Sequence, residues 1–106
     1  MNDRPLRKTV GHKSINQVYI VGEVVDIGFI PRNKGYIIRA RIKMRSNTKN
    51  GNLVYIDVYG YKRVCEVMTL VCQTGNIVYI EGEFRNFVTE RRTAKPFILV
   101  TYIECL

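Results

Sequence analysis

The segment from Gly35 to Arg45, GYIIRARIKMR, alternates strictly between two kinds of side chain. Uncharged or apolar residues occupy every second position from Ile38 to Met44, and the residue after each of them is cationic. Because successive side chains of a β-strand point to opposite faces, one face can enter a core while the other carries a row of positive charge. The pattern predicts a half-buried strand whose solvent side holds Arg39, Arg41, Lys43 and Arg45, called the cationic ladder below.

The cationic ladder lies in a stretch of sequence that contains no acid. Asp and Glu are absent from Ile27 to Ile56, and the whole chain of 106 residues has a formal net charge of +8. Like charges on one strand face repel each other, so the ladder is expected to attract an external anion, and a phosphodiester backbone offers a matching row of charge. A solvated strand face that binds nothing is the alternative interpretation.

Length and composition limit the class of protein. A chain of 106 residues fits one domain, and residues 1–14, which are polar and basic, are expected to form a flexible arm before a folded domain of residues 15–106. No apolar run approaches the roughly 20 residues of a membrane helix, so a soluble, cytoplasmic protein without membrane contact is expected. The three cysteines lack CxxC spacing, and no phosphate loop or nucleophile elbow occurs, which argues against a metal site, a cofactor and an enzyme.

The rest of the chain predicts four further strands and one helix. Tyr61 to Thr74 has apolar residues at helical spacing, whereas Phe29 to Gly35 is expected to be a loop because it contains Pro, Asn and Gly. The Asn-Gly pair in Ser46 to Asn52 indicates a hairpin. This order is that of the OB fold, an all-β five-stranded barrel with one helix between strands three and four. The predicted strands are Ile15 to Ile27, Gly35 to Arg45, Leu53 to Tyr61, Asn76 to Val88 and Pro96 to Leu106.

The first predicted strand has two largely apolar faces. Its second face carries Tyr19, Val21 and Val25, so it is expected to meet another surface, such as a second copy of the chain in a homodimer or homotetramer. Gly22, inside the same strand, predicts a bend or a β-bulge.

The third predicted strand places Tyr55, Asp57 and Tyr59 on one face, which adjoins the cationic ladder if strands two and three form the expected hairpin. Rings beside cations suit single-stranded nucleic acid, because bases stack on rings while cations contact phosphates. A cation and a ring recur at the end of the fourth strand, and the loops add further cations. The residues expected to bind nucleic acid are Arg39, Arg41, Lys43, Arg45, Lys49, Tyr55, Tyr59, Arg85, Phe87, Arg91, Arg92 and Lys95.

Three segments resemble the bacterial single-stranded DNA-binding protein (SSB) family: INQVYIVGEV, VYGYKRVCEV and TGNIVYIEGEFRNF. The resemblance covers nearly all of the predicted domain and implies an OB fold that wraps single-stranded DNA, usually as a tetramer. It also implies that Tyr59 stacks on a base and that Arg85 contacts a phosphate. The expected function is therefore non-catalytic binding of single-stranded DNA with little sequence preference, in DNA replication, recombination or repair.

The chain also departs from the SSB pattern. It has Leu53 and Thr89 where the family tends to have tryptophan, and no Trp at all, so charge is expected to contribute more to binding than stacking does. It ends at Leu106 without the acidic tip that SSB proteins usually carry, and is therefore similar to compact relatives such as the replication protein PriB and SSB-like proteins of phages and mobile elements. Two alternatives stay open: a PriB-like adaptor that acts through a replication helicase, primase or polymerase, and an OB domain that binds RNA.

Overall fold

The computed structural model describes residues 14–47, 49–88 and 91–106 of the chain. The predicted flexible arm, residues 1–14, lies outside these residues apart from Ser14, and Thr89 lies outside them as well. Within the described ranges no helix is long and apolar enough to cross a membrane.

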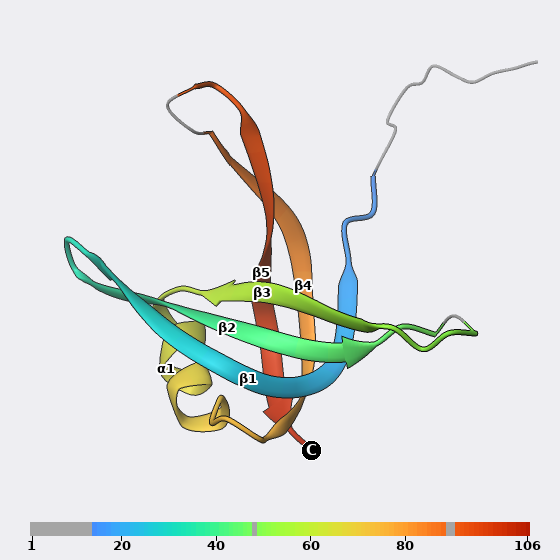
Figure 1. Ribbon diagram of the computed structural model, residues 1–106. Coiled ribbons are helices and arrows are strands. Elements are labelled where there is room, and N and C mark those ends of the chain that lie inside the picture. The colour runs from blue at the N-terminus through green and yellow to red at the C-terminus, as the bar shows by residue number, and fades with distance from the viewer. Residues whose placement is uncertain (1–13, 48, 89–90) are drawn as a thin grey trace, which may run out of the picture.

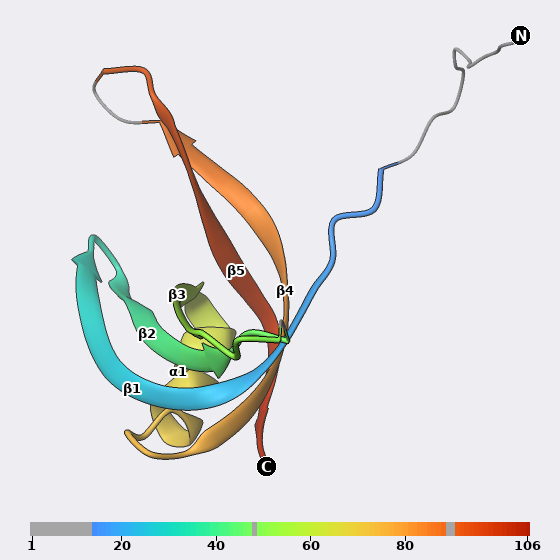
Figure 2. The same cartoon turned by 45° about the vertical axis from the view of Figure 1, so that its right-hand side comes forward.

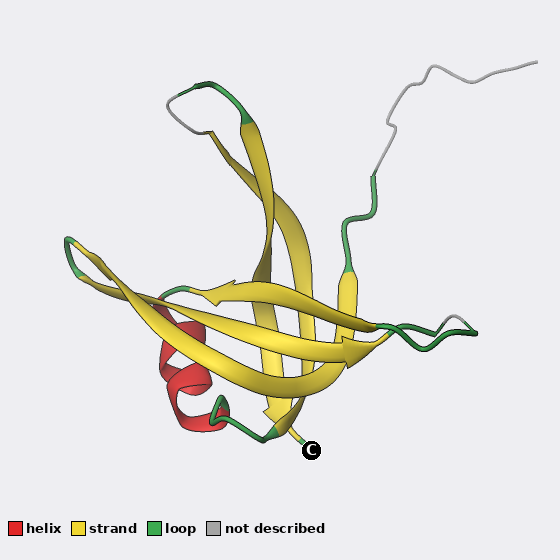
Figure 3. Ribbon diagram, in the orientation of Figure 1, coloured by secondary structure: helices red, strands yellow, loops and turns green. Residues whose placement is uncertain are grey.

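The described chain forms a closed barrel of strands with one helix at its end (Figures 1 and 3). In chain order its elements are β1 (Val18–Arg32), β2 (Gly35–Arg45), β3 (Leu53–Gly60), α1 (Lys62–Val71), β4 (Ile77–Val88) and β5 (Ala94–Cys105). Around the barrel the strand order is β1-β2-β3-β5-β4. The predicted fold, a five-stranded OB barrel with a helix between the third and fourth strands, is confirmed.

The alternation in β2 separates a core face from a solvent face, as predicted. Ile38, Ala40 and Ile42 have no exposed surface, whereas the residues of the cationic ladder are half-buried or exposed. The helix closes one end of the barrel and contributes Met68, which is fully buried, and Cys72, which is 1% exposed. Burial of apolar surface is the main stabilising term in such a core, so the core residues of β2 hold the cationic ladder facing outward.

The prediction of a loop from Phe29 to Gly35 is wrong, because most of this segment belongs to a β-hairpin. β1 continues through this segment and stays paired with β2 up to the turn, which consists of Asn33 and Lys34. Gly35 follows with a φ of 123°, a conformation that L side chains rarely adopt. Pro31 is tolerated because β1 pairs with β4 only from Val18 to Glu23. The later part of β1, which contains Pro31, has a free edge, so the missing N–H donor breaks no pairing with a second strand.

The β1–β2 hairpin and the β4–β5 hairpin extend beyond the barrel in different directions (Figures 1 and 2). β1 pairs with β4 only as far along β4 as Gly82, whereas β4 and β5 stay paired to Val88 and Ala94. Just beyond Gly82, the side-chain amide of Asn16 donates to the carbonyl oxygen of Phe84 at 2.7 Å and accepts from its N–H at 2.8 Å. Residues that precede β1 are thereby held against the free edge of β4.

Gly22, where a bend or a β-bulge was predicted, marks a close approach of two strands. The bulge lies nearby, between Val24 and Asp26, where the register of β1 with β2 shifts. A Cβ at Gly22 would lie 2.5 Å from Cγ2 of Ile42 and 2.6 Å from the carbonyl oxygen of Lys43. Only glycine therefore fits where β1 crosses β2.

Replacing Gly22 with alanine is expected to lower the free energy of unfolding by about 1–3 kcal/mol, because the β2 backbone cannot move away without disturbing its own pairing. Gly28→Ala is the matched control on the same strand. Its nearest neighbour would be Nη2 of Arg39, at 2.9 Å, the mobile end of a long side chain. Urea unfolding measures both variants, and a Gly22→Ala protein as stable as wild type would contradict the close approach.

Candidate nucleic-acid interface

β2 and β3 carry the predicted cations and rings on one solvent-facing surface. Side chains of directly paired residues lie on the same side of a sheet, so the rings of β3 lie beside the cations of β2. The predicted adjacency of the two strand faces is therefore confirmed. The register sets Lys43 opposite Tyr55, Arg41 opposite Asp57 and Arg39 opposite Tyr59, and these six residues are called the outer face below.

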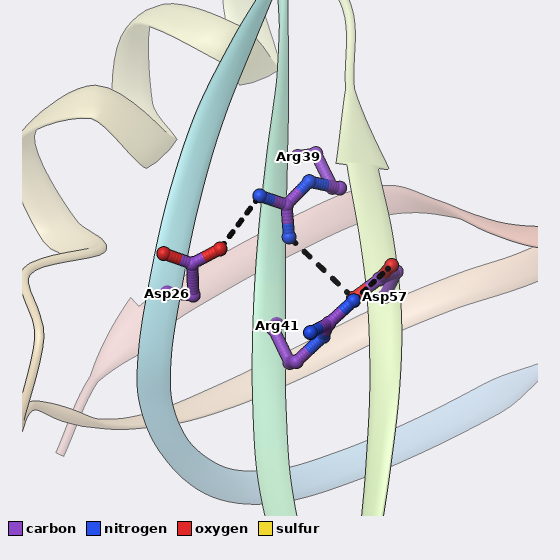
Figure 4. A network of polar contacts seen from close by, with 4 residues as sticks. All are labelled: Asp26, Arg39, Arg41 and Asp57. Carbon is purple, nitrogen blue, oxygen red and sulfur yellow. Dashed lines mark hydrogen bonds and ion pairs between the residues drawn. The ribbon is translucent and has the colours of Figure 1, made fainter.

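The cationic ladder is paired with acids from the neighbouring strands (Figure 4). Nη2 of Arg39 donates to Oδ2 of Asp26 at 2.7 Å, and Arg41 donates from Nε and Nη2 to the two oxygens of Asp57 at 2.9 and 3.3 Å. The ladder therefore has acidic partners, although its own stretch of sequence contains none. Asp26 and Asp57 directly border the acid-free stretch in the sequence, and the pairing of β1 and β3 with β2 brings both carboxylates onto it.

Lys43 and Arg45 have partners as well. Nζ of Lys43 lies 3.2 Å from Oε1 of Glu23, and Nη1 of Arg45 donates to the carbonyl oxygen of Gly51 at 2.8 Å. Three carboxylates thus lie beside the four ladder cations. These pairs are partly exposed, and such pairs typically contribute only about 0–1 kcal/mol, so an incoming phosphate can replace a carboxylate at small cost.

Arg39 is shared between two carboxylates without satisfying all its donors. Its Nη1 is buried, has no hydrogen-bond partner and lies 3.6 Å from Oδ1 of Asp57. The hydrogen bond from Arg39 lowers the pKa of Asp26, and the hydrogen bond to Asp57 raises the pKa of Arg41. Asp26 and Arg41 therefore stay ionised at neutral pH, and the network leaves one donor of the ladder unused.

A shallow depression of about 620 Å³ lies beside this network. Its lining consists of Val25, Asp26, Arg41, Tyr55 and Asp57, so the carboxylates and a guanidinium are open to a ligand from solvent. In the part of the chain that the structure describes, no three His, Cys, Asp or Glu side chains are grouped so that they could hold a metal ion.

A row of rings continues from β3 onto the β4–β5 hairpin. Tyr59 packs edge-on against Phe97 with centroids 5.5 Å apart, and Phe97 lies 5.5 Å from Phe87. The rings of Tyr55 and Phe87 are 55% and 47% exposed. Phe97 is absent from the predicted site residues, although its alternation with buried Ile98 is a signal that would have placed it on this surface.

The remaining predicted cations surround this row of rings. Arg85 on β4 donates to Oε1 of Glu83 at 2.5 Å, and Lys95 on β5 is paired across the hairpin with Phe87. Both lie near the rings of the hairpin, while the others belong to loops. The exposed loop cations are Lys49 between β2 and β3, and Arg91 and Arg92 between β4 and β5.

A second surface, formed by β1, β4 and β5, has a different chemistry. Tyr19 and Val21 are 64% and 53% exposed and leave apolar surface open on β1, whereas Val25, the third residue predicted on this face, lines the depression beside Arg41. The hydroxyl of Tyr79 donates to Glu81 at 2.7 Å, and this hydrogen bond raises the pKa of Tyr79 to about 12. We call this surface the tyrosine–glutamate face, and it comprises Tyr19, Val21, Tyr79, Glu81, Tyr102 and Glu104.

A closed five-stranded barrel, with a helix between β3 and β4 and rings and cations on β2 and β3, defines an OB-fold protein. No family model matches the chain, and no curated protein matches it in sequence.

Solved structures with this fold include small single-stranded DNA-binding proteins. The mitochondrial single-stranded DNA-binding protein Rim1 of S. cerevisiae superposes with a TM-score of 0.70 at 14% identity, over 89% of this chain and 96% of Rim1. The dimeric N-terminal domain of PriB from Thermoanaerobacter tencongensis gives 0.67 at 20% identity, over 86% and 96%. A small single-stranded DNA-binding protein from Streptomyces coelicolor gives 0.66 at 15% identity, over 84% and 90%. The predicted resemblance to SSB and PriB-like proteins is thus confirmed at the level of the fold.

Proposed function

We propose that this chain binds single-stranded DNA along the outer face, without catalysis and with little sequence preference. The observation that carries the proposal is the β2–β3 register, which sets two rings of β3, with Asp57 between them, beside three cations of β2. A single strand presents unpaired bases and one phosphate per nucleotide, and the outer face offers a partner for each. Every base has a π face, so stacking on Tyr55 and Tyr59 does not select a sequence.

Stacking is expected to contribute more to the affinity for single-stranded DNA than the absence of tryptophan suggested. A phosphate must replace Asp57 at Arg41 and Asp26 at Arg39, so the electrostatic gain is only the difference between two ion pairs. The ring of Tyr55 is 55% exposed and meets no such competition. Asp26 and Asp57 thus reduce the contribution of charge to binding, and they compete with any anion that brings no base to stack on the rings.

The proposed context is DNA replication, recombination or repair, supported by the fold shared with single-stranded DNA-binding proteins. We place the contact between copies of the chain on the tyrosine–glutamate face, since Tyr19 and Val21 leave apolar surface exposed there. The PriB domain with this fold is itself dimeric. A monomeric mass at every concentration in light scattering would contradict this part of the proposal.

A salt titration with a labelled oligo(dT) tests DNA binding by the wild-type protein. Contact with about four to six phosphates should give a slope of log affinity against log salt of roughly −3 to −4, from about −0.7 per contact. A duplex of equal length should bind more weakly because its bases cannot stack on the rings. Absence of binding at low salt, or equal affinity for duplex and single strand, would refute the proposal.

Replacing Asp57 with asparagine is expected to tighten DNA binding by about 2- to 10-fold at low salt, because it removes the carboxylate that competes with phosphate for Arg41. Glu104→Gln changes the net charge of the protein equally but lies on the tyrosine–glutamate face, so light scattering checks that its oligomeric state matches that of wild type. This variant should leave the affinity nearly unchanged. An Asp57→Asn protein that binds no tighter than Glu104→Gln would show that the acids do not restrain the ladder.

A further inference from the structure

A groove of about 960 Å³ lies between the β1–β2 hairpin and helix α1, outside the outer face. The hairpin contributes Phe29 and Tyr36, and the start of the helix contributes Tyr61, Lys62 and Glu66. Its volume falls within the range of about 300–1,000 Å³ that is usual for small-ligand sites.

The two rings of the hairpin lie on the inner side of β1 and β2, opposite to the cationic ladder. Phe29 is paired with the buried core residue Ile38, and Tyr36 precedes Ile38 by two positions on β2. Residues that are directly paired, or two apart on one strand, share a face. The groove is therefore a separate surface from the outer face, formed because the hairpin extends beyond the barrel (Figure 2).

The groove combines exposed rings with cations. Phe29 and Tyr36 are 52% and 61% exposed and pack edge-on with centroids 6.3 Å apart, and Tyr61 is 39% exposed. These rings contribute little to the core, so their apolar surface is available to a ligand. The charged residues that line the groove are Arg32, Lys34, Lys62 and Glu66, three cations and one acid.

The groove begins next to one end of the outer face. Tyr59 lies on the outer face at the end of β3, and two residues later Tyr61 lines the groove at the start of α1. Flat rings together with an excess of positive charge match an unpaired base and its phosphate.

We propose that this groove is a second nucleotide-binding site, which takes an unpaired base of single-stranded DNA on Phe29 and Tyr36 and an adjacent phosphate on the cations around them. This proposal rests on the proposed function, because it concerns the same bound strand. It predicts that short oligonucleotides fill only the outer face and that longer ones also reach the groove.

Tryptophan fluorescence separates the two sites, since the chain contains no tryptophan of its own. Tyr36→Trp places a single tryptophan in the groove. Tyr102→Trp places a single tryptophan on the tyrosine–glutamate face as a control. Oligo(dT) of about 4 and about 16 nucleotides, the range of OB-fold site sizes, is titrated into each variant. The longer oligonucleotide should quench Tyr36→Trp and leave Tyr102→Trp unchanged, and the shorter one should quench neither.

Affinity provides the second readout. Phe29→Ala combined with Tyr36→Ala should weaken binding of the longer oligonucleotide at least about 5-fold and leave the shorter one unaffected. Lys62→Gln should weaken it more than Arg63→Gln, which removes the same charge one residue further along the helix. Far-ultraviolet circular dichroism checks that the variants fold, which is expected because the replaced rings are exposed.

The outcomes distinguish this proposal from the previous one. If the longer oligonucleotide binds wild-type protein but leaves Tyr36→Trp unquenched and the Phe29→Ala, Tyr36→Ala protein at full affinity, the groove is not a nucleotide site and the outer-face proposal stands. If no oligonucleotide binds the wild-type protein, both proposals fail.

Discussion

Replacing Tyr55 and Tyr59 together with alanine is expected to weaken binding of single-stranded DNA roughly 30-fold or more, because stacking on such rings gives about 1–3 kcal/mol per base. Tyr55 is 55% exposed, so its loss leaves little cavity, whereas Tyr59 also supports the ring of Phe97. No charge is removed, so the slope of log affinity against log salt should stay as in wild type. Fluorescence anisotropy with a labelled oligo(dT) across a salt series measures both quantities.

The matched control for the tyrosine pair is Tyr55→Phe with Tyr59→Phe. It keeps both rings and removes only the hydroxyls, so its affinity should stay close to that of wild type. An alanine pair that binds as tightly as wild type would show that bases do not stack on the outer face. A phenylalanine pair as weak as the alanine pair would show that the hydroxyls, and not the rings, bind the DNA.

Replacing Arg39 and Arg41 together with alanine is expected to flatten the salt slope by about 1.4, since each lost phosphate contact removes about 0.7. The affinity for DNA should fall by more than the loss of two phosphate contacts explains. Asp26 and Asp57 would lose their hydrogen-bonded partners, and their carboxylates would then repel the phosphates. A salt titration of the variant measures the slope and the affinity together.

Adding Asp26→Asn and Asp57→Asn to the arginine pair separates the two effects. The fourfold variant should recover part of the affinity, because the repulsion is gone, but it should keep the flattened slope because the phosphate contacts are still missing. If Arg39→Ala with Arg41→Ala keeps the wild-type slope, the cationic ladder does not contact phosphates.

The parts of this fold that depend on local pattern were predictable from the sequence. The period of two in β2 identifies its core face, and the Asn-Gly pair predicts the hairpin that sets Lys43 beside Tyr55. Gly51 of that pair has a φ of 60°, a left-handed conformation that glycine adopts without strain. The barrel followed from the order of the elements, so the outer face could be assembled in advance from β2 and β3.

The parts that depend on pairing between distant strands were not predictable in the same way. Asp26 is near the cationic ladder only because a bulge in β1 sets its register with β2. Phe97 joins Tyr59 through the parallel contact of β3 with β5, which no turn specifies. The segment around Pro31 resembled a loop because the edge position of β1, which makes proline acceptable there, belongs to the folded barrel.

Photocrosslinking tests the central claim most directly, because it locates the DNA on the protein. An oligo(dT) that carries 5-iododeoxyuridine would be bound to the wild-type chain at low salt, irradiated, and its attachment sites mapped by mass spectrometry. Binding along the outer face predicts crosslinks at Tyr55, Tyr59 and the neighbouring Phe87. Crosslinks confined to Tyr19 and Tyr102 on the tyrosine–glutamate face, or no crosslink at all, would contradict it.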